Sequence, residues 1–183
     1  CDPDAARLDT LCRRWSIPHA SRSLADLVQD CRPDAVHLLV PPQYHAELAE
    51  EALQAGVHVL VEKPLALSGQ DCARLIDLPR ANDLHLGVNH NCLFQPPYRR
   101  LLADLKAGKL GRIEHVISIN NLPLAQLQSG EHDHWMFRAP ENVLFEQGPH
   151  PLAQICGLLG GIRRAETICS HERQLRTGAP FIA

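Results

Sequence analysis

The chain has 183 residues, a net charge of −3 at pH 7, 45% hydrophobic residues and only 4% aromatic residues. This composition is typical of a globular protein with a core, and it argues against a nucleic-acid-binding surface or a polybasic membrane patch. No apolar run reaches the ~18 residues needed to span a bilayer, and no signal peptide is recognisable.

Residues 1–89 alternate between helix-like and strand-like stretches. Helices are predicted over 4–15, over the Ala-, Leu- and Glu-rich stretch 45–56, and over 68–78, where Ser68 and Asp71 have capping-box spacing. Short apolar or β-branched stretches predict strands over 34–40, 57–61 and 84–89. This order predicts an α/β fold, with βαβ units on a Rossmann-type parallel sheet.

The pattern changes near residue 92. A helix is predicted over 96–108, with Pro96 and Pro97 at its start and Gly108 past its end, and a second helix over 149–161. The alternating stretch 112–121 predicts a strand of an open-faced sheet, 122–148 looks irregular, and a last strand is predicted over about 162–175. We therefore expect two domains, 1–91 and 92–183, the second being part of an α+β open-sheet domain.

Two of the predicted strands end in prolines that stand next to polar or charged residues. The first runs into "VPPQYH" (40–45) and the second into "VEKP" (61–64). Ligands of an open parallel sheet bind outside the carboxyl ends of its strands. A residue before proline is held in extended geometry, so Pro64 is expected to direct Lys63 off the sheet edge. The alternative is that Glu62 and Lys63 belong to a solvated loop.

The stretch "VPPQYHAELAEEALQAGVHVLVEKPLALS" (40–68) resembles the glucose-fructose oxidoreductase/inositol dehydrogenase/rhizopine-catabolism family of NAD(P)-dependent oxidoreductases. Residues 87–116 resemble the segment that leads into the second domain of that family, so the resemblance covers nearly the whole chain. The positions that match the first family pattern are Pro41, His45, Ala52, Leu53, Gly56, His58, Val59, Leu60, Glu62, Lys63 and Pro64.

The resemblance implies hydride transfer between a nicotinamide and a hydroxyl or carbonyl of a sugar, polyol or cyclitol. Lys63 would hydrogen-bond the reacting oxygen. His150 would be the general base and Glu146 would orient the site, in "EQGPH". The family has Asp where this chain has Glu146, and a glycine-rich run where it has residues 140–142.

The resemblance also implies a dinucleotide site, with NAD preferred to NADP because Asp2 would accept from the adenosine ribose and repel a 2′-phosphate. The alternative for Asp2 is a helix cap ahead of Pro3. No G-x-G-x-x-G occurs. We therefore expect that the chain is an internal part of a longer protein, lacking the first strand and the glycine-rich loop of the dinucleotide-binding domain, and that it binds the cofactor weakly or not at all on its own. The cofactor-binding residues implied are Asp2, Val40, Pro41, Pro42, His45, Glu62, Lys63 and Pro64.

The seven cysteines form no C-x-x-C pair, which indicates reduced thiols in a cytoplasmic protein. His132, Asp133 and His134 lack an identifiable further ligand, so no metal site is expected. Asn89, His90 and Asn91 end a strand but receive no individual role. The family also implies a homo-oligomer formed through the second domain's sheet. A non-catalytic cofactor-binding regulator of the same fold and an NAD-dependent glycosidase remain as alternative functions.

Overall fold

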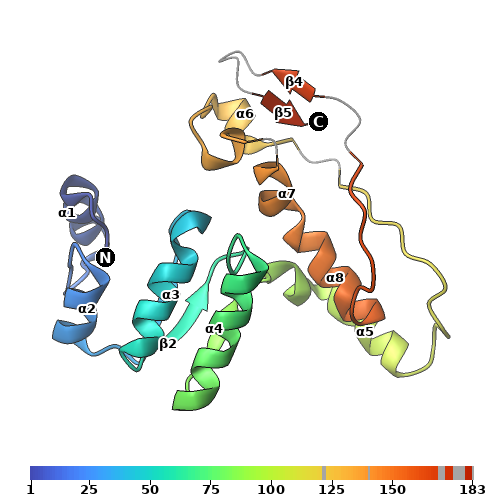
Figure 1. Cartoon of the computed structure of the whole chain (residues 1–183), viewed down its shortest axis with the longest axis horizontal. Helices are drawn as coiled ribbons and strands as arrows, with labels where there is room; N and C mark the ends of the chain where they lie inside the picture. The colour runs from blue at the N-terminus through green and yellow to red at the C-terminus, as the bar shows by residue number, and fades with distance from the viewer. Residues whose placement is uncertain (121–122, 140, 169–171, 175–179, 183) are drawn as a thin grey trace. The chain divides into compact units, whose positions relative to one another are not determined.

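The chain divides into two units, Cys1–Asn89 (unit 1) and His90–Ala183 (unit 2). The structure is a computed structural model that describes residues 1–120, 123–139, 141–168, 172–174 and 180–182 (Figure 1).

Unit 1 is built on a three-stranded parallel sheet. Its strands are β1 (Ala35–Leu38), β2 (His58–Val61) and β3 (Leu86–Val88), in the spatial order β1-β2-β3. The register places Leu38 beside Val61, and Val61 beside Val88. The three carboxyl ends therefore meet at one edge, and the predicted α/β class with a Rossmann-type sheet is confirmed.

Four helices accompany this sheet: α1 (Ala5–Trp15), α2 (Leu24–Cys31), α3 (His45–Gln54) and α4 (Gly69–Asn82). The 3-10 turn η1 (Pro42–Tyr44) precedes α3. The helices predicted over 4–15, 45–56 and 68–78 are confirmed, although α4 continues through Pro79. Helix α2 was not predicted, and its signal is the Ser23 side chain, which accepts from the amide of Asp26 three residues later.

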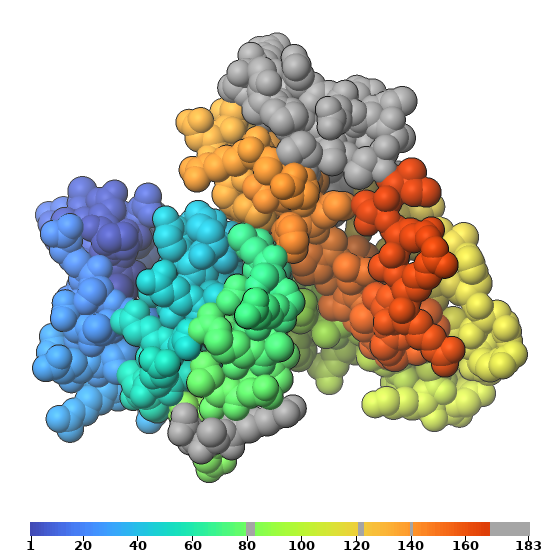
Figure 2. Space-filling view, in the orientation of Figure 1, coloured from blue at the N-terminus to red at the C-terminus, as the bar shows by residue number. Residues whose placement is uncertain are grey.

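The core of unit 1 lies on one face of the sheet, beneath α3 and α4. These two helices pack against each other, as the adjoining blue-green and green surfaces in Figure 2 show. Val59 and Val61 point into this core and are buried, whereas Leu60 between them is 40% exposed. Strand β2 therefore has one covered face, with the period of two that a half-buried strand requires.

The described residues of unit 2 form several helices, one short pair of strands and long connecting segments. Its two longest helices, α5 (Pro96–Lys106) and α8 (Pro149–Leu159), confirm the predictions over 96–108 and 149–161. The shorter elements are the 3-10 turns η2 (Asn91–Phe94) and η3 (Trp135–Phe137), helices α6 (Ala125–Ser129) and α7 (Asn142–Gln147), and the antiparallel strands β4 (Glu172–Gln174) and β5 (Pro180–Ile182).

Three predictions for unit 2 are wrong in the described residues. Residues 112–120 form no strand, because nothing described here pairs with them, and Ile117 and Ile119 are 74% and 75% exposed. Residues 162–168 also form no strand, and only Glu172–Gln174 of the last predicted strand does. The stretch predicted to be irregular contains α6, η3 and α7, because Trp135, Met136 and Phe137 form a small buried cluster there.

Because the core of unit 1 lies on one side of the sheet, two neighbouring residues of α4 should differ in how much they contribute to stability. Leu75 is 0% exposed and Ile76 is 46% exposed. We expect Leu75→Ala to lower the unfolding free energy of unit 1 by ~2–5 kcal/mol, because a cavity forms in the core. The matched Ile76→Ala is expected to cost much less. Hydrogen exchange of the β2 amides reports on this unit, and equal effects of the two variants would contradict the assigned core.

Candidate active site at the strand ends

The carboxyl edge of the sheet continues one residue beyond the strands themselves. The amide of Glu62 donates to the carbonyl of Leu38 (3.1 Å), and the amide of Asn89 donates to that of Val61 (2.8 Å). Lys63 directly follows Glu62 at this edge. It is half-buried, and its peptide bond to the buried Pro64 is cis.

The Glu62 carboxylate links the ends of all three strands. The Asn89 side-chain amide, past the end of β3, donates to Glu62 Oε1 at 2.6 Å. His37 Nε2, on β1, lies 3.6 Å from the same oxygen. The cofactor contact predicted for Glu62 stays a prediction, and these contacts give the residue a structural role beside it. Sequence reasoning missed both partners, because their neighbourhood depends on the sheet register.

The loop after β1 is tied to the loop after β2 through His45. Val40 is half-buried, Pro41 is exposed, and the buried Pro42 begins η1. His45 follows as the first residue of α3 and is 0% exposed. Its Nδ1 lies 2.6 Å from the carbonyl oxygen of Pro64, and its Nε2 lies 2.8 Å from that of Val40.

Asp2 lies in unit 1 ahead of α1. Its carboxylate accepts from the amide of Asp4 (2.9 Å) and pairs with Arg7 (3.3 Å). The cap of α1 is Asp4, which accepts from the amides of Ala6 and Arg7. Those backbone hydrogen bonds hold the pKa of the Asp4 carboxyl below its usual range. Asp2 is therefore not the N-cap of α1, and its predicted contact with a ribose stays a prediction.

Glu146 and His150 lie in unit 2, on α7 and α8, which meet at Gly148. Gly148 has helical dihedrals (φ −62°, ψ −37°), and the amide of Leu152 donates to its carbonyl. The four-residue spacing from Glu146 to His150 is thus about one helical turn, which puts i and i+4 on one side. Both side chains are half-buried.

The N-terminal half of α8 is anchored to η2 and α5 by three hydrogen bonds. Cys92 Sγ donates to the carbonyl of His150 (3.3 Å), and Gln154 Nε2 donates to that of Cys92 (3.2 Å). Tyr98 Oη donates to the carbonyl of Gln154 (2.9 Å). Burial raises the pKa of both the Cys92 thiol and the Tyr98 hydroxyl, so both donors keep their protons. Nothing in the local sequence marked these positioning contacts.

The other candidate features are a possible metal site, His90 and a possible membrane span. No group of three His, Cys, Asp or Glu side chains within the described ranges could hold a metal ion, His132, Asp133 and His134 included. Burial lowers the pKa of His90. None of the helices in the described residues is long and apolar enough to cross a membrane.

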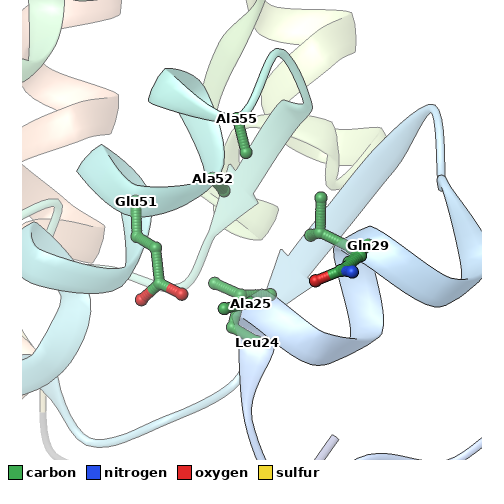
Figure 3. A pocket seen from close by; sticks show the side chains of 7 residues that line it. Leu24, Ala25, Gln29, Glu51, Ala52 and Ala55 are labelled. Atoms are coloured by element: carbon green, nitrogen blue, oxygen red, sulfur yellow. The ribbon is translucent and has the colours of Figure 1, made fainter.

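A shallow groove lies between α2 and α3 of unit 1 (Figure 3). Its walls are mostly alkyl, and the Gln29 and Glu51 side chains carry its polar ends. It contains none of the predicted site residues, so it is no part of the candidate active site. The lining residues are Leu24, Ala25, Val28, Gln29, Glu51, Ala52 and Ala55.

Residues 1–90 match the family described as "Oxidoreductase family, NAD-binding Rossmann fold". Two curated relatives are similar over longer stretches. A dTDP-3,4-didehydro-2,6-dideoxy-alpha-D-glucose 3-reductase of Streptomyces violaceoruber is 32% identical over 140 residues, 76% of this chain and 40% of the relative. An inositol 2-dehydrogenase of Corynebacterium glutamicum (strain R) is 30% identical over 113 residues, 61% of this chain and 34% of the relative.

A solved structure shows the same fold over most of the chain. The myo-inositol 2-dehydrogenase of Lactobacillus plantarum superposes with a TM-score of 0.76 at 18% identity, covering 87% of this chain and 47% of that one. The present chain spans less than half the length of these three proteins.

The anchoring of α8 predicts that Gly157 cannot be replaced freely. A Cβ atom at Gly157 would clash with the hydroxyl of the buried Tyr98. We expect Gly157→Ala to lower the unfolding free energy of unit 2 by ~1–3 kcal/mol, the usual cost of overpacking. Hydrogen exchange of the α8 amides measures this loss.

Gly161→Ala is the matched control, because a Cβ there would meet nothing within 4 Å. The double variant Gly157→Ala/Tyr98→Phe should recover part of the loss, since it removes the clashing hydroxyl. Equal behaviour of the Gly157 and Gly161 variants would show that Tyr98 does not approach α8 as described.

Proposed function

Because residues 1–90 belong to the oxidoreductase family with an NAD-binding Rossmann fold, we propose that the protein transfers hydride between a nicotinamide cofactor and a hydroxyl or carbonyl group of a sugar, polyol or cyclitol. The observation that carries the proposal is the position of Lys63, which directly follows Glu62 at the carboxyl edge of the parallel sheet. Open α/β sheets bind their ligands at this edge.

Lys63, His150 and Glu146 have separate roles in this proposal. The nicotinamide supplies the hydride acceptor or donor. In the oxidation direction, a ring nitrogen of His150 takes the proton of the substrate hydroxyl as hydride leaves the carbon, because an imidazole titrates near neutral pH. The Lys63 ammonium stabilises the negative charge that develops on the same oxygen. Glu146, one turn before His150, orients the base.

The cofactor is proposed to be NAD, held at the edge of unit 1. The residues assigned to it are Asp2 for the adenosine ribose and the strand-end loops at 40–45 and 62–64. The backbone of these loops offers few competing donors, because Pro41, Pro42 and Pro64 lack an N–H group. A flat ring can therefore approach the carboxyl edge closely.

The class of substrate is proposed from the relatives. By their names, one reduces a dTDP-linked dideoxy sugar and another oxidises inositol, and both reactions interconvert a ring hydroxyl and a ketone. A cyclic substrate whose ring carries the reacting hydroxyl or ketone is common to them. We assign the same class to this protein.

Location and assembly are part of the same proposal. We propose a cytoplasmic protein, because Cys1, Cys12, Cys31, Cys72, Cys92 and Cys156 are free thiols, as a reducing compartment would keep them. Cys169 lies outside the described residues. We also propose a homo-oligomer formed through the second domain, 92–183.

The catalytic assignment predicts the effect of two substitutions in the full-length protein. We expect Lys63→Ala and His150→Ala each to lower turnover by ~10²–10⁴-fold, since each removes a group that acts on the reacting oxygen. NADH formation from a panel of sugars and cyclitols measures the effect.

Lys109→Ala is the control for the loss of a lysine, because Lys109 is exposed and pairs with Asp104. Its turnover should stay at the level of the unsubstituted protein. Near-normal turnover in both site variants would remove Lys63 and His150 from the mechanism. NADH binding without any turnover on the panel would favour the regulatory alternative.

The assignment of Asp2 predicts the choice of cofactor. We expect Asp2→Ala to lower the preference for NAD over NADP by roughly tenfold, because a carboxylate near a 2′-phosphate costs ~1 kcal/mol or more in repulsion. The comparison of kcat/KM for the two cofactors measures this. Asp9→Ala removes the same charge from α1 and should leave the preference unchanged. A similar shift in both variants would point to net charge rather than a ribose contact.

A further inference from the structure

His45 is the first residue of α3, and its side chain has no exposed surface. The match to the family pattern suggested a contact with the cofactor at this position. A ring that is 0% exposed can reach a ligand only through the groups that it touches. The role of His45 must therefore be sought in its two partners.

Those partners belong to the two loops that carry the candidate site. Pairing of β1 with β2 runs from Ala35 and His58 to Leu38 and Val61, so Val40 and Pro64 lie beyond the last paired residues. His45 Nε2 contacts the carbonyl of Val40 at 2.8 Å, and Nδ1 contacts that of Pro64 at 2.6 Å. The ring thus joins the loops at the point where the sheet no longer does.

We propose that His45 is a positioning residue, which holds Pro64 in place through its carbonyl and thereby fixes the direction of Lys63. The catalytic consequence rests on the proposed function, whereas the effect on the lysine does not. Pro64 is the neighbour of Lys63 in sequence, so a shift of its carbonyl moves the Lys63 backbone as well.

A histidine suits position 45 because the two loops lack backbone N–H donors. Three prolines at positions 41, 42 and 64 remove backbone N–H groups from these turns. Buried carbonyl groups need partners, and leaving one unpaired is costly. Imidazole has nitrogens on two sides of a rigid ring and can approach two carbonyls at once. A neutral ring donates to one of them, and a doubly protonated ring donates to both.

Three variants separate the two contacts. His45→Asn keeps an amide nitrogen near the place of Nδ1, next to Pro64. His45→Gln keeps one near the place of Nε2, next to Val40. His45→Phe keeps a flat ring but donates to neither. The proposal predicts that the direction of Lys63 is preserved best in the Asn variant and least in the Phe variant.

The test measures how fast Lys63 reacts in the full-length protein. The chain has three lysines, and Lys106 and Lys109, both in unit 2, serve as internal references. The proteins are acetylated with acetic anhydride below their melting temperatures, and peptide mass spectrometry gives the rate for each lysine. Lys63 is half-buried, so loosening of its loop should accelerate its acetylation relative to the references.

We expect a relative acceleration of roughly fivefold in the Phe variant, the effect of losing one net hydrogen bond, and a smaller change in the Asn variant. Turnover should follow the same order. The value of kcat should fall, whereas the KM for NAD should change less. Unchanged acetylation of Lys63 in the Phe variant would overturn the proposal. Equal acceleration in the Asn and Phe variants would also overturn it, since the Pro64 contact would then be irrelevant.

The design separates a failure of this inference from a failure of the proposed function. If Lys63→Ala retains full turnover, the hydride-transfer assignment falls, while the acetylation rates still report on His45. If Lys63→Ala is inactive but the His45 variants leave both acetylation and kcat unchanged, only the positioning role falls. Melting temperatures measured beside the rates exclude global unfolding as the cause of faster labelling.

Discussion

The position of β2 between two parallel neighbours is the constraint on which the candidate site depends. A strand paired on both sides has its register fixed at every residue, so the residue where it ends is fixed as well. The last rungs of the ladder hold Glu62 and Asn89 in line with the strands. Lys63 comes immediately after these rungs, so its backbone starts from a well-defined point.

Polar side chains then extend this order beyond the backbone ladder. Glu62 is within reach of a side chain from each neighbouring strand, and His45 contacts a carbonyl from each of two loops. The charged and proline residues after β2 thus have distinct roles. Glu62 accepts from Asn89 at the sheet edge, Pro64 contacts His45 through its carbonyl, and Lys63 is the residue proposed to act on the substrate.

The sequence was most informative where local pattern and tertiary structure agree. The alternation of strands and helices over 34–89 predicted the parallel sheet, because short apolar stretches alternate there with stretches rich in helix-forming residues. The position of Lys63 at a strand end followed from the same pattern. The partners of that end did not, since Asn89 and His37 are separated from Glu62 by 27 and 25 residues and meet it only through the register.

Unit 2 shows the opposite case. The alternating residues 112–121 have the composition of a strand, but a strand also needs a neighbour to pair with, and pattern alone does not supply one. The cluster of Trp135, Met136 and Phe137 was missed for a related reason. Its short helices are stabilised by burial against Leu124 and Leu127 rather than by their own propensity.

Residues 112–120 pair with no strand in the part of the chain that the structure describes. Ile117 and Ile119 are two residues apart and about three-quarters exposed, so both would lie on one side of an extended chain. Free backbone groups beside exposed β-branched side chains form a template for pairing with another chain. Residues 112–120 thus combine the two features of a surface to which another strand can be added.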